Sequence, residues 1–154
     1  MICKAIFIGV VATVFMDLIA MARRCLFGTP SLDYALLGRW VGHLPKGRLI
    51  HRPIGQSPTI PGERALGWAA HYLTGILFGA VLLSAADTPT GPVAPILFGA
   101  ATVLAPFLLL QPGMGAGLAA RRMPSPWRAR ARSLLTHVSF GLGLWIGALL
   151  LGGA

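Results

Sequence analysis

Four stretches of the chain consist almost entirely of apolar residues, and each is about as long as a lipid bilayer is thick. A spanning helix needs about 20 apolar residues. Polar residues rarely recur at helical spacing in these stretches, so none of them has a solvated face. The pattern predicts an all-α membrane-spanning four-helix bundle in a single domain, residues 1–154. The spans are residues 5–22, 65–86, 93–112 and 133–151, and the third either ends at 112 or continues to 120.

A cleaved signal peptide is the alternative interpretation of the first stretch. Ala20, Met21 and Ala22 resemble a small-residue cleavage site after an apolar run. Asp17 interrupts that run, however, and cleavage would leave the arginines that follow on the outer side of the membrane. The first stretch is therefore expected to be retained as a helix.

The first connection, residues 23–64, is long for a bundle of this size and is expected to have structure of its own. Thr29 or Ser31 could cap a short helix over residues 32–41, which would lie in the membrane interface. The segment after residue 47 contains several prolines and is expected to be irregular. His43 and His51, which lie in this connection, are expected to be solvated rather than to act as ligands.

The third stretch contains two prolines, Pro106 and Pro112, which cannot donate a helical hydrogen bond. A helix through them would leave the carbonyls of Thr102 and Leu108 without donors. The sequence predicts a break near residues 111–113. Around such a break the Gln111 amide, the freed carbonyls and the glycines at 113, 115 and 117 could line a polar cavity, as broken helices do in transporters.

The composition supports a lipid environment and the charges suggest an orientation. Hydrophobic residues make up 55% of the 154 residues and charged residues 11%, against roughly a quarter in soluble domains. The net charge of +9 does not indicate nucleic-acid binding, because the basic residues adjoin apolar runs. By the positive-inside rule both long connections face the cytoplasm and both termini the periplasm of a bacterial inner membrane. The connections hold Arg23, Arg24, Arg39, Lys46, Arg48, Arg52, Arg64, Arg121, Arg122, Arg128, Arg130 and Arg132, and only Lys4 lies opposite.

The sequence has no motif of soluble-enzyme chemistry. Cys3 and Cys25 flank the first predicted helix and would lie roughly 33 Å apart, too far for a disulfide. The chain has no Cys/His zinc spacing, Walker loop, dinucleotide fingerprint or GxSxG elbow. We therefore assign no catalytic residue, cofactor or metal ligand from motifs.

Polar residues at membrane depth are the candidate site. Asp17, His71 and His137 each lie five to seven residues inside a basic boundary, which places them about 8 to 10 Å into one leaflet. Small residues flank each at four-residue spacing, so their faces are candidates for the bundle interior. We expect the three side chains to approach one another near the broken third helix, where Gln111 is a fourth candidate.

Five short motifs are distributed along the chain. They are ATVFMDL at 12–18, PSLDYA at 30–35, GRWVGH at 38–43, GERALGW at 62–68 and QPGMG at 111–115. Together they resemble a bacterial family of small integral membrane proteins, the domain of unknown function 2938. The resemblance covers nearly the whole chain and implies a four-helix inner-membrane protein, but it implies no activity, substrate or catalytic residue.

Three classes of function remain open from the residues alone. A structural or accessory membrane protein would use the polar residues as hydrogen-bonded pairs that fix helix register. A small carrier or channel component would use them as a proton, ion or small-molecule site, and a membrane-embedded enzyme would use them for chemistry. The expected partners are the lipid bilayer, acidic lipid headgroups at the basic connections, and either further copies of the chain or another membrane protein.

Overall fold

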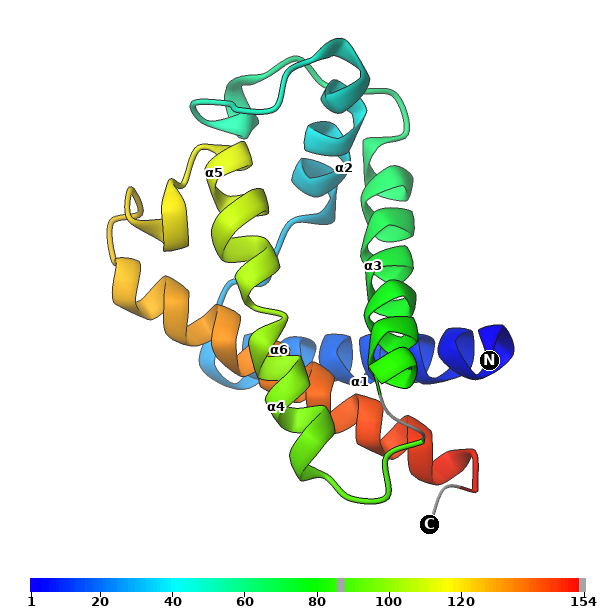
Figure 1. Ribbon diagram of the computed structural model, residues 1–154. Coiled ribbons are helices and arrows are strands. Elements are labelled where there is room, and N and C mark those ends of the chain that lie inside the picture. Colours follow the sequence, from blue (N-terminus) through cyan, green and yellow to red (C-terminus); the bar gives the residue numbers. More distant parts are fainter. Residues whose placement is uncertain (86–87, 153–154) are drawn as a thin grey trace. The chain divides into compact units, whose positions relative to one another are not determined.

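The computed structural model describes residues 1–85 and 88–152, and within those ranges its regular structure is helical (Figure 1). Ala86, Asp87, Gly153 and Ala154, which belong to the predicted second span, the turn after it and the C-terminal tail, lie outside the described residues. The elements are α1 (Ile2–Phe27), α2 (Tyr34–His43), η1 (Leu44–Lys46), η2 (Ile54–Gln56), α3 (Glu63–Ala85), α4 (Val93–Ala101), η3 (Pro106–Leu110), α5 (Gln111–Met114), η4 (Leu118–Ala120) and α6 (Pro126–Leu150).

Four helices in the described residues are long and apolar enough to cross a membrane. They are Ile2–Phe27, Glu63–Ala85, Val93–Met114 and Pro126–Leu150. This finding confirms the predicted all-α fold with four candidate spans. The last helix begins seven residues earlier than the predicted fourth span, because Pro126 is well suited to the first position of a helix. Arg128, Arg130 and Arg132 therefore belong to the first turns of α6 rather than to a connection.

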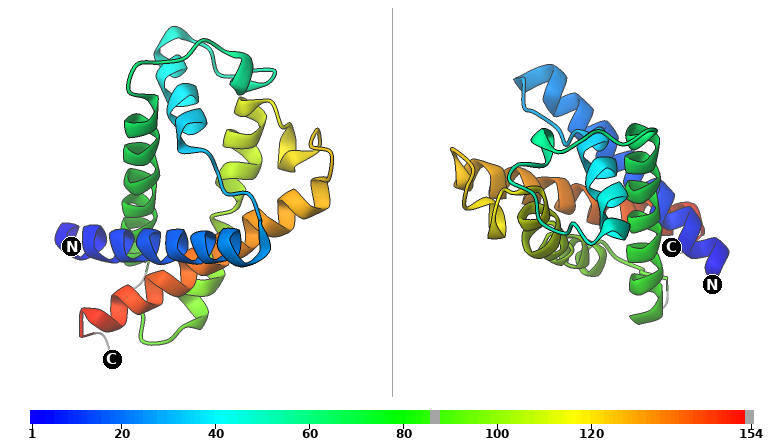
Figure 2. Two further views of the ribbon diagram at one scale, coloured as in Figure 1. Left: turned by 180° about the vertical axis from the view of Figure 1, so that it is seen from behind. Right: turned by 90° about the horizontal axis from the view of Figure 1, so that it is seen from above.

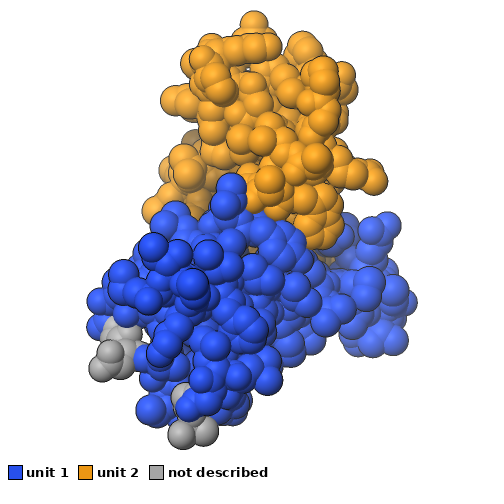
Figure 3. Space-filling view, turned by 90° about the vertical axis from the view of Figure 1, so that its right-hand side faces the viewer, with its two compact units in different colours: residues 1–31, 72–102, 134–154 blue, residues 32–71, 103–133 orange. Residues whose placement is uncertain are grey.

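The chain divides into two compact units, which Figure 3 shows in two colours. Unit 1 contains residues 1–31, 72–102 and 134–154, and unit 2 contains residues 32–71 and 103–133. The single-domain organisation expected from the sequence stays a prediction.

In unit 1 the long helices pack closely against one another at glycines. A Cβ at Gly9 of α1 would lie 2.5 Å from the Ile76 Cα of α3, and one at Gly143 of α6 would lie 2.7 Å from the Ala12 Cα of α1. A Cβ at Gly141 would lie 2.6 Å from the Pro95 carbonyl oxygen of α4. Small residues let helix backbones come this close, which is how helices associate when lipid is as apolar as their side chains. Figure 2 shows these helices from two further directions.

The interior of unit 1 is largely apolar, and its buried hydroxyls at Thr13 and Thr102 donate to the carbonyls of Gly9 and Gly99. On α1 the buried residues recur every three or four positions, as expected for one face of a helix. Phe78 packs edge-on against both Phe98 and Phe140, at ring-centroid distances of 6.5 and 6.2 Å. The buried cluster consists of Ile8, Ala12, Met16, Leu82, Phe140, Leu144 and Ala148.

Unit 2 packs short elements around Trp40. Leu37, Trp40 and Ile54 form its buried cluster, and Leu110 and Met114 pack against it. The helices α2 and α3 approach at Gly38 and Gly67, where an added Cβ would collide with the backbone carbonyls of Glu63 and Tyr34. The unit therefore combines an aromatic core with a close helix contact.

The predicted short helix in the first connection is present as α2, but its cap differs from the prediction. Asp33, and not Thr29 or Ser31, occupies the N-cap position and accepts a hydrogen bond of 2.9 Å from the Ala35 amide. The helix runs to His43 and continues as the short η1 before Gly47 turns the chain. The predicted helix, residues 32–41, began two residues before the observed one, because both predicted cap residues precede Asp33.

The break predicted at residues 111–113 is not where the helix changes. The chain makes a turn at Thr102 and Val103, widens into a π-helix over Pro106–Leu110, and then continues through Pro112 to Met114. Gly115 ends it with φ of 97°. The π-helix accommodates the prolines, because the Gln111 amide bonds to the Pro106 carbonyl.

The glycines after this helix do not line a cavity as predicted. A Cβ on Gly113 would collide with the Trp40 indole, and one on Gly115 would lie 2.6 Å from the His51 carbonyl oxygen. The Gly113 carbonyl also accepts a hydrogen bond of 2.8 Å from the His51 amide. The space at these positions is therefore filled by the first connection.

Candidate functional site

Two of the four nominated residues, Asp17 and His137, belong to unit 1. The Tyr72 hydroxyl of α3 donates to Asp17 Oδ2 at 3.5 Å. Thr102 Oγ1 lies 2.7 Å from His137 Nδ1 and donates its proton to the Gly99 carbonyl at 2.6 Å. Because a hydroxyl has only one proton, His137 donates from Nδ1 in this arrangement. Each bond connects two separate segments of the chain.

His71 belongs to unit 2 and joins a cluster of three aromatic rings. Its Nε2 lies 3.0 Å from the Tyr34 hydroxyl of α2. The Tyr34 ring lies 4.1 Å from the Trp68 ring and 4.6 Å from the His71 ring, measured between centroids. The imidazole therefore fixes α3 against α2 through both a hydrogen bond and ring contact.

Gln111, also in unit 2, is only partly satisfied. Its Nε2 donates to Ser133 Oγ of α6 at 3.3 Å. Its Oε1 is buried and has no hydrogen-bond partner within the part of the chain that the structure describes. Gln111 lies directly after the π-helix, a kind of irregularity that is frequent at functional sites.

The expected meeting of Asp17, His71 and His137 stays a prediction, because these residues divide between the two units. Within residues 1–85 and 88–152, no group of three or more His, Cys, Asp or Glu side chains is placed to hold a metal ion. What the nominated residues share is a hydrogen bond to a side chain on another element of the same unit.

Sequence reasoning missed the partners of these residues, which are Tyr34, Tyr72, Thr102 and Ser133. All four are hydroxyl-bearing. A signal was available for Tyr72 and Ser133, because Tyr72 directly follows His71 and Ser133 directly follows Arg132. Matching hydroxyls to acids and imidazoles at equal helix depth would have found them.

An ion pair in unit 2 was also missed. Arg39 Nε and Nη2 bond to the two carboxylate oxygens of Glu63 at 2.8 and 2.7 Å, in the two-pronged geometry that favours arginine. Arg39 Nη1 reaches the carbonyls of Gly55 and Ser57 at 3.2 and 3.3 Å. The hydrogen bond with Glu63 raises the pKa of the Arg39 guanidinium above its ordinary value. This side chain holds the first connection against the start of α3.

His43 and His51 are buried, so the prediction that they are solvated was wrong. Their exposed fractions are 2% and 7%, and their ring centroids lie 5.2 Å apart. His43 Nε2 bonds to the Pro58 carbonyl at 3.0 Å, and His51 Nδ1 lies 2.7 Å from Ser57 Oγ. These partners satisfy both ring nitrogens of His51 but only one of His43, whose buried Nδ1 has no hydrogen-bond partner in the described part of the chain. The hydrogen bonds of the two buried rings therefore stabilise the fold of the first connection.

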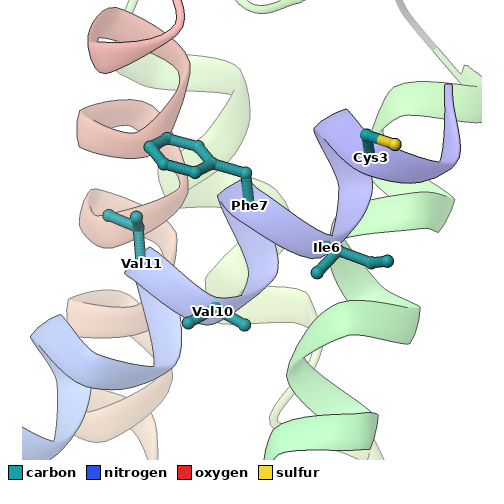
Figure 4. A pocket seen from close by; sticks show the side chains of 5 residues that line it. All are labelled: Cys3, Ile6, Phe7, Val10 and Val11. Carbon is teal, nitrogen blue, oxygen red and sulfur yellow. The ribbon is translucent and has the colours of Figure 1, made fainter.

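An apolar groove of about 380 Å³ lies on α1 in unit 1. Figure 4 shows the five side chains that line it, and all of them project from the same helix. They are Cys3, Ile6, Phe7, Val10 and Val11. Both cysteines of the chain, Cys3 and Cys25, are free and exposed.

Four apolar helices, glycine-mediated helix contacts and paired intramembrane polar residues define a multi-pass membrane protein. Residues 6–151 match the model of the family described as "Protein of unknown function (DUF2938)". The chain belongs to this family, as its motifs indicated. No match was found among curated proteins or among solved structures.

Proposed function

We propose that this chain is an integral protein of the bacterial inner membrane with a structural or accessory role. One observation carries the proposal: Asp17, His71, Gln111 and His137 each bond to a side chain from a different element of their own unit. A residue that binds a transported ion or a substrate must leave groups available to it. Residues that bond across helices instead fix how the helices are aligned.

The energetics of lipid favour this role. A polar side chain facing hydrocarbon costs on the order of 2 to 3 kcal/mol when it is charged at midspan. Pairing Asp17 with Tyr72, and His137 with Thr102, lowers that cost and is lost if either helix slides by one residue. Apolar helix surfaces alone would allow several alignments of the helices. The polar pairs therefore favour one alignment, because the others lose the hydrogen bonds.

The Asp17→Asn variant tests whether the pair is structural. It preserves shape and keeps an oxygen that can accept from Tyr72, but it removes the charge from this long hydrogen bond of 3.5 Å, so we expect a small loss of resistance to thermal unfolding in mild detergent. Asp33→Asn is the matched control, because asparagine caps a helix about as well as aspartate. If Asp17→Asn left stability unchanged but abolished complementation of a deletion strain, the polar residues would be a functional site.

The accessory role predicts a partner of another sequence. Purification from membranes in a gentle detergent should recover the chain with a second, different membrane protein in constant proportion. A homo-oligomer recovered alone would favour a carrier instead, because four helices are few for a transport path. A single monomeric species in native membranes would contradict both the accessory and the carrier proposals.

The orientation belongs to the same proposal and rests on twelve basic residues in the two connections and the first turns of α6, against Lys4 on the other side. We expect a reporter active only in the periplasm to function when it is fused after Ala154. A reporter that works only in the cytoplasm should be inactive there. The opposite pattern would refute periplasmic termini while leaving the number of spans unaffected.

A carrier or channel component is the second candidate, and one observation favours it. The buried Oε1 of Gln111 lacks a partner in the described part of the chain and adjoins the π-helix. An unsatisfied acceptor of this kind could bind a proton donor, a cation or a small polar molecule. Gln111→Leu should abolish such binding, whereas a structural amide should only lower stability.

A further inference from the structure

Residues 46–52 of unit 2, called here the anchor loop, combine two exposed apolar side chains with three exposed cations. Leu49 is 60% exposed and Ile50 is 66% exposed. Lys46, Arg48 and Arg52 surround them and are also exposed. An exposed loop in water usually contains few large apolar residues, so this combination requires an explanation.

The exposure is a fixed property of the loop, because hydrogen bonds hold its backbone on both sides of the apolar pair. The Trp40 indole donates to the Leu49 carbonyl at 3.0 Å, and the His51 amide donates to the Gly113 carbonyl at 2.8 Å. His51 Nε2 also bonds to the Arg48 carbonyl at 3.2 Å. Turning Leu49 and Ile50 inward would break this set of bonds, and Trp40 and His51 already occupy the interior.

Only one environment suits both parts of the loop. The hydrocarbon core is unfavourable for three cations, and water is unfavourable for two adjacent apolar side chains. The headgroup boundary of an anionic leaflet accepts both, since apolar groups reach the acyl chains while lysine and arginine contact phosphates. Lipid always adjoins this chain, because four of its helices are apolar enough to span a membrane.

The same pattern recurs in unit 2 where the second connection enters the first turn of α6. Trp127 is 77% exposed and Met123 is 41% exposed. Their neighbours Arg121, Arg122 and Arg128 are exposed as well. Tryptophan next to basic residues is typical of the membrane interface, so a second segment shows the same preference independently.

We propose that the anchor loop docks on an anionic lipid surface, with Leu49 and Ile50 inserted at the acyl boundary and Lys46, Arg48 and Arg52 bound to headgroup phosphates. This inference rests on the proposed membrane role and adds a lipid class and a binding element to it. Docking would hold the first connection against the bilayer and so fix the start of α3.

The test uses the full chain in lipid nanodiscs of zwitterionic phosphatidylcholine, with or without anionic phosphatidylglycerol. In a Cys3→Ser, Cys25→Ser background, an environment-sensitive dye is attached at Ile50→Cys. Thr59→Cys, an exposed position of the same connection without flanking cations, is the matched control. With anionic lipid we expect the dye at residue 50 to shift to the blue and to resist an aqueous quencher, while the dye at residue 59 stays accessible.

A second test neutralises the cations of the anchor loop. Each of Lys46→Gln, Arg48→Gln and Arg52→Gln should lower the ratio of docked to undocked loop about fivefold, and salt should have the same direction of effect. The proposal would be overturned if the dye at residue 50 were equally protected from the quencher with and without anionic lipid. It would also be overturned if this protection required a copurified protein. Failure to enter nanodiscs would instead refute the membrane role itself, so the two failures are distinguishable.

Discussion

The two units of this chain both contain close glycine contacts between helices, but they differ in where their polar bonds lie. In unit 1 the helices meet at glycines, and the buried cluster is aliphatic and aromatic. In unit 2 an arginine–glutamate pair, two buried histidines and a tryptophan indole all bond to backbone or side chains of the first connection. Both units therefore use close backbone approach, and unit 2 adds a set of polar bonds within the first connection.

The reason for the difference is the surroundings of each part of the chain. Between apolar helices in lipid no hydrophobic force favours contact, so stability comes from van der Waals packing at small residues. Irregular backbone such as residues 44–62 is tolerated only where its polar groups find partners. Unit 2 supplies these partners from Arg39, Trp40, His43 and His51. Variants at Trp40, Gly141 and Thr102 test how far each unit depends on these contacts.

The largest effect is expected from Trp40→Ala in unit 2. The side chain is 8% exposed, lies at the centre of its cluster and donates to the Leu49 carbonyl. Truncating a buried tryptophan costs about 3 to 5 kcal/mol, to be measured by unfolding in mixed micelles. Trp127→Ala is the control, since that residue is 77% exposed and its loss should change stability by less than about 0.5 kcal/mol.

Amide hydrogen exchange in the Trp40→Ala variant separates the units further. Protection should fall in α2 and in the connection that Trp40 holds, whereas α1 should retain its protection. An equal loss in both units would show that they unfold together and would remove the basis of the comparison.

The intermediate effect is expected from Gly141→Ala in unit 1. The new methyl group would lie 2.6 Å from the Pro95 carbonyl and 2.8 Å from the Ile96 Cα, both of them backbone atoms that cannot rotate away. Forcing α6 away from α4 should cost about 1 to 3 kcal/mol in the same unfolding assay. Gly91→Ala, where a Cβ would have open space, should leave stability nearly unchanged. Tolerance of alanine at residue 141 would mean that the helices do not pack through this glycine.

The sequence predicted the spans better than the first connection, because apolar length is a local property and burial of a loop is not. The four spans could be located from runs of apolar residues alone. The burial of His43 and His51 depends on residues 48–58 folding back over α2, a contact between segments that no periodicity reveals. The sequence around these two rings favoured solvation, but in the structure they bond to the Pro58 carbonyl and to Ser57 Oγ.

The candidate site shows the same limit. Depth counted from basic residues identified Asp17, His71, Gln111 and His137 as polar residues that need partners. It could not select those partners, since helix rotation and pairing are set by glycine contacts such as Gly99 with Gly141. The prolines of the third span were likewise visible, but whether a helix breaks or widens into a π-turn depends on its neighbours.

The smallest effect is expected from Thr102→Val, which tests whether unit 1 also depends on polar bonds. Valine keeps the shape but removes the hydroxyl that lies 2.7 Å from His137 Nδ1, so we expect a loss of about 1 kcal/mol in the unfolding assay. Thr102→Ser restores a hydroxyl and should recover most of that stability, and Thr90→Val, at an exposed position, is the control. If valine were neutral, the Thr102–His137 bond would not fix helix register, and packing at glycines alone would hold unit 1 together. A loss that serine recovers would instead show that a polar bond between α6 and the end of α4 acts together with the Gly99–Gly141 contact at the same helix pair.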